Sequence, residues 1–156
     1  DSILKKIILA DKAKKELGIK GKIAVAGLNP HNGENGLFGD EEEKIIAPAV
    51  KKAVQMGIDA EGPIVPDTLF VKMLRDVYNI AVVMYHDQGL IPMKMESFGC
   101  GVNVTVGLPI IRTSVDHGTA FDIAGKWIAD SGSLEKAVET ALLMIDNREK
   151  SLILLT

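Results

Sequence analysis

The sequence predicts an α/β fold with a mainly parallel sheet, and two observations carry this prediction. Short apolar runs, rich in small and β-branched residues, occupy residues 22–28 and 79–85, which is typical of buried parallel strands. Stretches with helical spacing of apolar residues alternate with these runs. Because the sequence contains no internal repeat and no low-complexity linker, residues 1–156 are interpreted as a single α/β segment.

The first half of the chain indicates helix, strand, loop and helix in turn. Residues 3–17 predict an amphipathic helix with lysines on its polar face and an apolar face made of Ile3, Leu4, Ile7, Ile8 and Ala13. The strand at 22–28 leads into a turn-rich loop at 29–40. Asp40 is predicted to cap a helix that runs to about Met56, because acidic residues suit the positive end of a helix.

The second half continues the alternation. Residues 62–70 predict a short extended segment and a turn into a helix, and the strand at 79–85 follows. A third strand is predicted at 101–108, and residues 117–127 are interpreted as a loop that enters a helix. A final helix starts near Ser133, and its apolar positions share one face: Leu134, Val138, Ala141, Leu142 and Ile145.

Composition excludes several classes of function. The formal net charge is −3 and the basic residues form no run, so binding to nucleic-acid phosphates is not favoured. No apolar run approaches the roughly 18 residues of a membrane span, and no signal peptide is visible. The single cysteine, Cys100, permits no intrachain disulfide and fits a reducing cytosol, so a cytoplasmic location is expected.

Polar side chains follow both clear strands. Residues 29–40 come after the first strand, and residues 85–94 come after the second. Parallel α/β sheets bind ligands beyond the carboxyl ends of their strands. His31 and His86 stand in these two clusters, in glycine-rich segments interpreted as loops, and neutral imidazole is a common ligand of divalent metals. The alternative is a pair of loop histidines that bond to the backbone.

Two further sets of residues suit a reaction on an anionic substrate. Asp67 and Asp87 carry carboxylates that can take a proton from an alcohol, although Asp67 also suits an N-cap and Asp87 a turn. Lys94, Asn103 and Arg112 suit a phosphate or carboxylate if they converge on one cleft, and are otherwise solvated surface groups.

Residues 117–122 have the parts of a nucleoside-binding loop. A histidine can stack on or bond to adenine, and an aspartate can accept hydrogen bonds from ribose hydroxyls. The candidates are His117, Gly118, Thr119 and Asp122. The Gly-x-Gly-x-x-Gly fingerprint of dinucleotide-binding strands is absent, and the alternative is a threonine-capped helix start.

Four ordered segments together resemble one enzyme family. The segments LNPHNGENGLFG, GPIVPDTLF, YHDQGLIPMK and GVNVTVGLPIIRTSVDHGTAFDIAG are similar to the signature blocks of 4-hydroxythreonine-4-phosphate dehydrogenases. The last segment also resembles a loop of isocitrate and isopropylmalate dehydrogenases. The resemblance runs from about Lys22 to Met144. It implies the α/β/α sandwich of that superfamily and a homodimer with active sites at the interface.

The resemblance also implies roles for the candidate residues. His31 and His86 correspond to two of three metal-binding histidines, and Asp67 and Asp87 to acids around the reacting alcohol. The substrate contacts correspond to Lys94, Asn103 and Arg112, and the nucleotide loop to residues 117–122. The family's chain is roughly twice this length. The segment is therefore expected to be the C-terminal part of a longer two-domain dehydrogenase, inactive without the half that supplies the third histidine.

The reaction implied is a metal-dependent oxidation with NAD or NADP. The substrate would be 4-phosphohydroxy-L-threonine, which decarboxylates to 3-amino-2-oxopropyl phosphate on the way to pyridoxal 5′-phosphate, with zinc, cobalt, magnesium or manganese as the metal. The alternatives are a paralogue that oxidises 4-phospho-D-threonate or 4-phospho-D-erythronate, and a non-catalytic half-domain that binds a nucleotide or metabolite. Residues 32–42 and 93–103 differ from the biosynthetic enzyme and tilt the choice slightly towards a paralogue.

Overall fold

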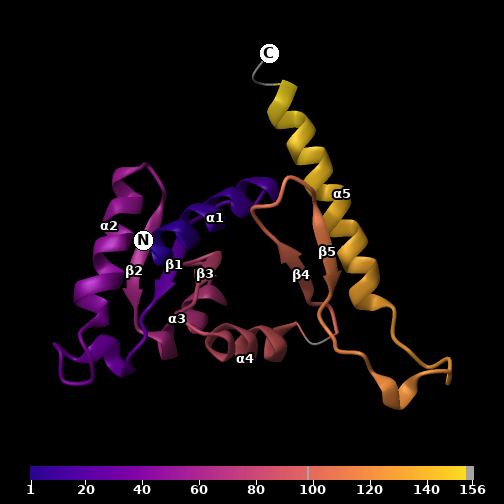
Figure 1. Ribbon diagram of the computed structural model, residues 1–156, viewed down its shortest axis with the longest axis horizontal. Helices are drawn as coiled ribbons and strands as arrows, with labels where there is room; N and C mark the ends of the chain where they lie inside the picture. Colours follow the sequence, from indigo (N-terminus) through magenta and orange to yellow (C-terminus); the bar gives the residue numbers. More distant parts are fainter. Residues whose placement is uncertain (98, 154–156) are drawn as a thin grey trace. The chain divides into compact units, whose positions relative to one another are not determined.

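The computed structural model describes residues 1–97 and 99–153, with side chains described to residue 150. The larger elements, labelled in Figure 1, are α1 (Ser2–Glu16), β1 (Ile23–Ala26), α2 (Ala47–Gln55), β2 (Ala60–Ile64), α3 (Pro66–Met73), β3 (Ile80–Val82), α4 (His86–Glu96), β4 (Val102–Thr105), β5 (Arg112–Val115) and α5 (Gly132–Ile153). Short helical segments are η1 (Pro30–Gly33), η2 (Glu42–Ile46) and η3 (Phe121–Ile123). The contacts define two compact units: residues 1–15 with 19–92, and residues 16–18 with the chain from Met93 onward.

The first unit contains the predicted parallel sheet. Its strand order is β2-β1-β3, and both neighbours pair with β1 in parallel. Ile23 of β1 stands opposite Ala60 of β2 on one side and Ile80 of β3 on the other. The strands predicted at 22–28 and 79–85 are therefore confirmed, and the extended segment predicted at 62–70 overlaps β2.

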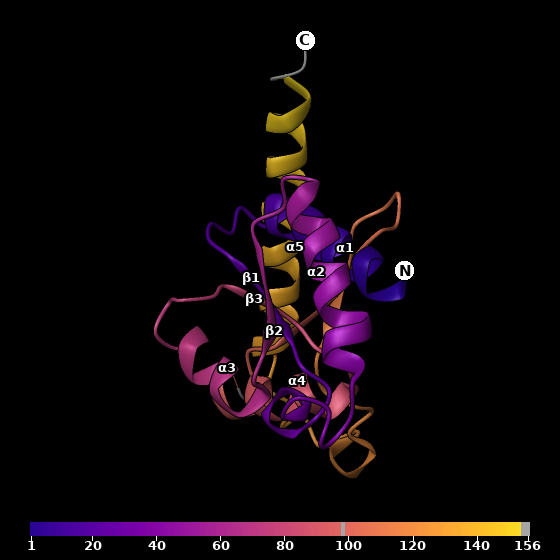
Figure 2. The same ribbon diagram turned by 90° about the vertical axis from the view of Figure 1, so that its left-hand side faces the viewer.

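Helices cover both faces of this sheet. Ile23 and Val25 of β1 are fully buried in a cluster with Ile7 of α1 and with residues of α2. Ala24 and Ala26 point to the opposite face and pack with residues of α3. Figure 2 shows the result, with α1 and α2 on one side of the strands and α3 on the other. This arrangement confirms the predicted α/β class and leaves the carboxyl ends of the strands for loops.

The second unit is an antiparallel ribbon with one long helix. β4 pairs with β5 so that Asn103 stands opposite Ser114 and Thr105 opposite Arg112. The strand predicted at 101–108 is thus present but does not join the parallel sheet. The hydroxyl of Thr113 donates to the carbonyl oxygen of Ala137 at 2.9 Å, which fixes α5 against the ribbon.

The apolar stripe predicted on the final helix does not supply its buried face. Ser133, Ala137 and Met144 of α5 are buried, whereas Leu134, Val138 and Leu142 are more than half exposed. The small side chains of Ser133 and Ala137 let the helix backbone come close to the ribbon, where Ser133 Oγ donates to Gly101 O at 2.7 Å. The face of α5 with small side chains is therefore the buried one, because it allows the helix backbone to lie close to the ribbon.

Two local expectations differ from the structure. Asp40 does precede the first helical residue, but its carboxylate pairs with the Lys44 ammonium, and no hydrogen bond described for it caps a helix N–H. Residues 117–127 form the single turn η3 and no longer helix, with Ala120 in the left-handed region at φ 48°. A non-glycine residue with positive φ is uncommon inside a helix, so η3 does not extend back through Ala120.

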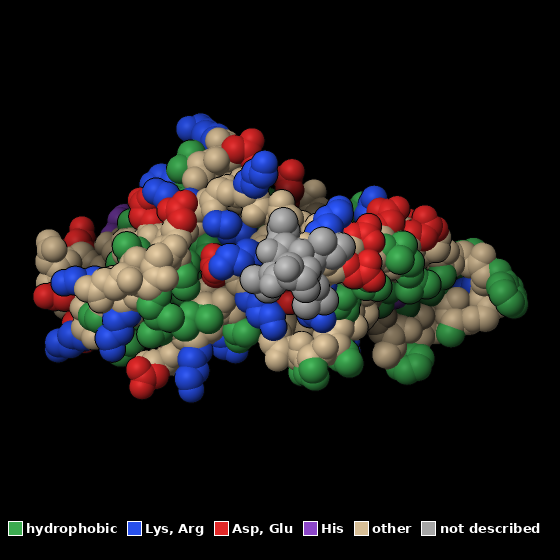
Figure 3. Space-filling view, turned by 90° about the horizontal axis from the view of Figure 1, so that it is seen from above, with side chains coloured by type: hydrophobic (Ala, Val, Ile, Leu, Met, Phe, Trp, Pro, Cys, Tyr) green, Lys and Arg blue, Asp and Glu red, His purple; other side chains and the backbone are tan. Residues whose placement is uncertain are grey.

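The surface is mixed in charge. In the face that Figure 3 shows, acidic and basic side chains are interspersed among apolar ones. None of the helices within residues 1–97 and 99–153 combines the length and the apolar character needed to cross a lipid bilayer.

Candidate functional site

The first unit gathers four of the predicted residues at one edge of the parallel sheet. His31 follows β1, Asp67 follows β2, and His86 and Asp87 follow β3. Because the three strands are parallel neighbours, their carboxyl ends lie at the same edge. The structure therefore brings the predicted metal and acid residues of this unit to the edge where such sheets bind ligands.

His86 begins a helix, contrary to the loop interpretation of its segment. α4 starts at His86 and includes Gly89 and Pro92, two residues that disfavour a helix interior. Asp87 lies in the first turn, where a carboxylate suits the positive helix end. The helix places both side chains at its exposed start, directly beyond β3.

The imidazole of His86 is paired with Asp87. Nδ1 lies 2.7 Å from Asp87 Oδ1, and both side chains are mostly exposed. A carboxylate on Nδ1 orients the ring and leaves Nε2 as the atom that would meet a metal, an arrangement common at metal sites. Asp87 was predicted to stand beside the reacting alcohol; in the structure its carboxylate is joined to the candidate metal ligand.

His31 occupies a left-handed backbone conformation. His31 has φ 52° and ψ 30°, and Asn32 has φ 56° and ψ 38°. Such values cost about 1–3 kcal/mol at a non-glycine residue, so the surroundings must impose them. One restraint is visible: Asn32 Nδ2 donates to the carbonyl oxygen of Pro63 at 2.9 Å. The loop that carries His31 is thus fixed to β2, the neighbour of β1 in the sheet.

A buried glutamate holds the chain just before His31. One carboxylate oxygen of Glu42, Oε1, accepts the backbone N–H groups of Leu28 and Asn29, each at 2.7 Å. Glu42 is 4% exposed, and Asn29 Nδ2 donates to its other oxygen at 3.0 Å. Burial acts to raise the pKa of Glu42, but the hydrogen bonds from Asn29 and Leu28 prevail and hold this pKa below 4.5.

A buried glutamine holds the same segment from the other side. Gln88 is 7% exposed, and its Nε2 donates to the carbonyl oxygen of Gly27 at 2.8 Å. Sequence reasoning assigned neither Gln88 nor Glu42 a role. A signal for Glu42 exists, because Glu42 falls in helical register with the buried positions Ile46, Val50 and Ala53. Gln88 carries no comparable periodic signal.

The histidines fit a metal site only as part of a larger ligand set. Within residues 1–97 and 99–153, no three His, Cys, Asp or Glu side chains lie close enough together to hold a metal ion. Two imidazoles at one sheet edge, one of them oriented by a carboxylate, match the donor types that zinc and related divalent ions accept. Such a pair needs at least one further ligand.

Asp67 is not the N-cap of its helix. α3 begins at Pro66 with Val65 at the N-cap, and Asp67 lies exposed in the first turn. Its carboxylate therefore faces solvent beyond β2, which is compatible with the predicted role near the reacting alcohol and excludes the capping alternative.

The three candidate substrate contacts belong to the second unit. Asn103 and Arg112 lie on the same face of the β4–β5 ribbon. Asn103 shares its face with Thr105, two residues along β4, and Thr105 stands opposite Arg112. The other face carries Thr113, which contacts α5, so Asn103 and Arg112 face away from that helix. Lys94 Nζ lies 3.4 Å from Asp116 Oδ2, and Arg112 Nη1 donates to Thr105 Oγ1 at 2.9 Å.

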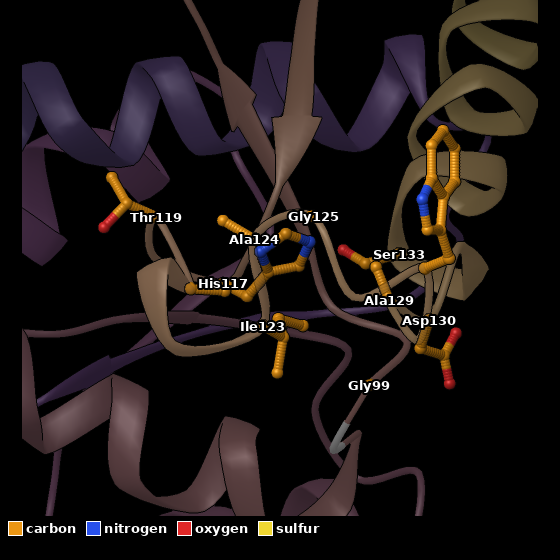
Figure 4. Close-up of a pocket in the computed structure, with 11 residues that line it drawn as sticks. Gly99, His117, Thr119, Ile123, Ala124, Gly125, Ala129, Asp130 and Ser133 are labelled. Carbon is orange, nitrogen blue, oxygen red and sulfur yellow. The ribbon is translucent and has the colours of Figure 1, made fainter.

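An open cavity of about 610 Å³ adjoins the predicted nucleotide loop. His117 and Thr119 line it, together with Ile123, Gly125 and Ser133, whereas Gly118 and Asp122 do not. Figure 4 shows the His117 imidazole and the Thr119 side chain projecting in opposite directions from the loop. The volume of the cavity falls within the range of small-ligand pockets. The cavity thus coincides with two of the four predicted cofactor contacts.

Comparison with known families decides which family these features represent. The family described as pyridoxal phosphate biosynthetic protein PdxA matches residues 1–141. The chain belongs to the PdxA family. The resemblance to 4-hydroxythreonine-4-phosphate dehydrogenases expected from the signature segments is confirmed.

Individual PdxA relatives carry two different substrate names. A 4-hydroxythreonine-4-phosphate dehydrogenase of Beijerinckia indica is 57% identical over 136 residues, covering 86% of this chain and 40% of the relative. A D-threonate 4-phosphate dehydrogenase of Salmonella typhimurium is 53% identical over 135 residues, covering 86% and 41%. The crystal structure of a 4-hydroxythreonine-4-phosphate dehydrogenase from Klebsiella pneumoniae matches with a TM-score of 0.80 and 49% identity, covering 91% and 44%. The chain spans less than half the length of these relatives.

Proposed function

We propose that this chain forms part of a dehydrogenase that oxidises a phosphorylated hydroxy acid with NAD or NADP and a divalent metal ion. The observation that carries the proposal is the edge of the β2-β1-β3 sheet, where His31 and the His86–Asp87 pair follow adjacent strands. PdxA relatives more than half identical to the chain are named as dehydrogenases of such acids.

The metal would be held by His31 and His86, with a further ligand from outside this chain. The donor set suits zinc, cobalt, magnesium or manganese to differing degrees. When bound, a divalent ion acts as a Lewis acid that lowers the pKa of the substrate alcohol and stabilises negative charge on its oxygen. The chain's own contribution is to keep the two imidazoles oriented, and Asp87 does this for His86.

Proton and hydride leave the alcohol in different directions. Asp67 and Asp87 are the candidates to take the hydroxyl proton, and a bound nicotinamide ring would supply the acceptor for the hydride of the carbinol carbon. Asp67 is exposed in the first turn of α3 and makes no capping bond, so its carboxylate is available to accept a proton. The two electrons of the C–H bond would thus go to the nicotinamide with the hydride, and the hydroxyl proton would go to the carboxylate.

Anionic groups of the substrate would be met by Lys94, Asn103 and Arg112. Arg112 uses Nη1 for Thr105, and its guanidinium has four further N–H donors. Lys94 contacts Asp116 at 3.4 Å, a distance long enough that a phosphate can compete for the ammonium. Asn103 shares the face of Arg112 and offers an amide for a hydroxyl or carboxylate oxygen.

The dinucleotide would bind along residues 117–122. His117 and Thr119 line the cavity, which supports contacts with the adenosine part of NAD or NADP. A Cβ at Gly118 would meet no atom within 4 Å, so the space beside this residue is open to a ligand. Asp122 lies in η3, beside the cavity-lining Ile123, as a candidate for the ribose hydroxyls.

Two substrates are supported by different relatives. The first is 4-phosphohydroxy-L-threonine, because the Beijerinckia relative is named as a 4-hydroxythreonine-4-phosphate dehydrogenase. Its oxidation and decarboxylation would give 3-amino-2-oxopropyl phosphate, the product expected on the way to pyridoxal 5′-phosphate. The second is 4-phospho-D-threonate, because the Salmonella relative is named as a D-threonate 4-phosphate dehydrogenase. The related acid 4-phospho-D-erythronate stays a further candidate. Phe98, within one of the segments that separate these alternatives, lies outside the described residues.

A homodimer in the cytoplasm completes the proposal. Helix α5 offers an apolar surface for such an assembly, because three of its apolar side chains are more than half exposed: Leu134, Val138 and Leu142. Light scattering on the intact protein tests it, with a dimeric mass expected.

A substrate panel tests the proposed activity. The intact protein with NAD and metal is given 4-phosphohydroxy-L-threonine, 4-phospho-D-threonate or 4-phospho-D-erythronate, and NADH formation is followed by absorbance. The expected result is turnover of at least one of these and none of their dephosphorylated forms. Binding of NAD with no NADH formed from any acid would instead favour the non-catalytic half-domain.

A further inference from the structure

The buried side chain of Gln88 joins the two segments that carry the candidate metal histidines. Its Nε2 donates to Gly27 O at 2.8 Å, and its Oε1 accepts the backbone N–H of Met84 at 2.7 Å. The amide nitrogen faces a carbonyl oxygen and the amide oxygen faces an N–H group, so one orientation of the amide satisfies both partners. A buried amide with both ends bonded is held in a single rotamer.

The two ends of this bridge lie close in sequence to His31 and His86. Gln88 lies in the first turn of α4, next to Asp87, which bonds to the His86 ring. Gly27 directly follows β1 and leads through Leu28, Asn29 and Pro30 to His31. The Gln88 amide is therefore a direct connection between the start of α4 and the segment before His31.

Other bonds fix the same peptide segment in the remaining directions. Gly27 N–H donates to Ile64 O at 2.9 Å, and the N–H groups of Leu28 and Asn29 both donate to the buried Glu42. The carbonyl of Gly27 is held by Gln88. The segment before His31 is thus anchored to β2, to the helix that contains Glu42 and, through Gln88 alone among the described bonds, to α4.

We propose that Gln88 is a positioning residue that sets the separation of His31 and His86 and thereby tunes metal affinity. This inference rests on the proposed function, because it takes the two histidines as metal ligands. Two ligands on separate segments of the chain bind an ion tightly only when their spacing is held before the ion arrives. His31 stands in a left-handed conformation that relaxes readily once its anchors weaken.

Two variants of Gln88 test the proposal. Gln88→Met keeps the length and buried volume of the side chain but removes both hydrogen bonds, and Gln88→Asn keeps the amide but shortens its reach. Tyr78→Phe is the matched control, because it removes a buried hydroxyl that donates to Glu61 at 2.9 Å in the same unit, ahead of β3. The Tyr78 control lies at the amino ends of the strands, away from the histidines.

The readout is the dissociation constant of Co²⁺ and Zn²⁺ for the intact protein freed of metal, measured by competition with a chromophoric chelator. Both Gln88 variants are expected to bind roughly 10–100-fold more weakly, as for other residues that orient metal ligands. The absorption spectrum of bound Co²⁺ should also change. Tyr78→Phe should lower the melting temperature and leave affinity and spectrum unaltered.

The outcomes separate this inference from the proposed function. Wild-type affinity in a folded Gln88→Met or Gln88→Asn protein overturns the positioning role while the metal site stands. Wild-type affinity in His86→Ala shows that the metal binds elsewhere and overturns both. If Gln88→Met does not fold, the smaller change in Gln88→Asn decides the question.

Discussion

Asn29 and Glu42 are joined by two hydrogen bonds, from Asn29 N–H to Oε1 at 2.7 Å and from Asn29 Nδ2 to Oε2 at 3.0 Å. Glu42 is 4% exposed, so this carboxylate is a buried charge that depends on backbone and amide donors for its solvation. The pair fixes the turn between β1 and His31. The Glu42 carboxylate therefore contributes both to the stability of the fold and to the position of the segment before His31.

Replacing Glu42 by glutamine should destabilise the fold. The amide keeps one oxygen but turns an NH₂ group towards Asn29 Nδ2, which leaves donors unpaired in a buried place. The expected loss is about 1–3 kcal/mol of unfolding free energy, measured by urea denaturation. The exposed neighbour provides the control, since Glu43→Gln should change stability by less than about 0.5 kcal/mol.

The stability contributed by Glu42 should disappear in acid. Its folded-state pKa lies below the ordinary value of 4.5, because the donors from Asn29 and Leu28 outweigh burial. The stabilisation is therefore fully present above pH 4.5 and is lost as pH falls below 4.5 through the folded-state pKa. Unfolding free energies of wild type and Glu42→Gln, measured from neutral to acid pH, should converge in that acid range. A difference that stays constant with pH would contradict this account.

Gly27 is required by close approach. A Cβ at this position would lie 2.3 Å from Asn32 Oδ1 and 3.1 Å from Glu42 Oε1. Gly27→Ala should therefore cost about 1–3 kcal/mol of unfolding free energy, because both side chains are themselves hydrogen-bonded. Gly118→Ala serves as comparison, since a Cβ there meets nothing within 4 Å, and equal losses in the two variants would argue against the clash.

Asp87→Asn should weaken metal binding. The carboxylate lies 2.7 Å from His86 Nδ1, and an amide there can no longer favour the tautomer that leaves Nε2 for the metal. Zinc affinity of the intact protein is expected to fall roughly 10–100-fold by chelator competition. His117→Ala, in the other unit, should bind zinc as wild type does; a matching loss there would point to a general effect on folding.

Arg112→Lys should impair use of phosphorylated substrates. Lysine keeps the charge but loses the planar fork that contacts an anion through two parallel bonds. We expect KM to rise roughly tenfold or more, with a smaller change in kcat. The exposed Arg75, which lies in the first unit after α3, gives the control variant Arg75→Lys. An unchanged KM in Arg112→Lys would remove Arg112 from the substrate site.

The sequence predicted the parallel sheet because burial on both faces leaves continuous apolar runs. The runs at Ile23–Ala26 and Ile80–Val82 are of this kind, and the polar clusters after them mark the ligand edge. The ribbon of β4 and β5 was not distinguished from a further parallel strand. The alternation of valine with Asn103 and Thr105 predicts a strand with one polar face, but only the register shows the antiparallel pairing.

Side-chain roles were harder to predict than strands. Nothing in the acidic run distinguishes the buried Glu42 from the exposed Glu43 except register with Ile46 and Val50. The exposed stripe of α5 was equally misleading, since periodicity shows which residues share a face and not which face is covered. Long-range contacts such as Gln88 to Gly27 have no local signature at all.

Metal-dependent NAD reduction tests the central claim most directly. NADH formation by the intact protein with the three phosphorylated acids is measured after metal removal and again after a divalent ion is restored, in wild type and in His31→Ala. The account predicts activity in wild type that vanishes on metal removal and returns with the ion, and no recovery in His31→Ala. Equal NADH formation with and without metal, or full recovery in His31→Ala, would contradict it.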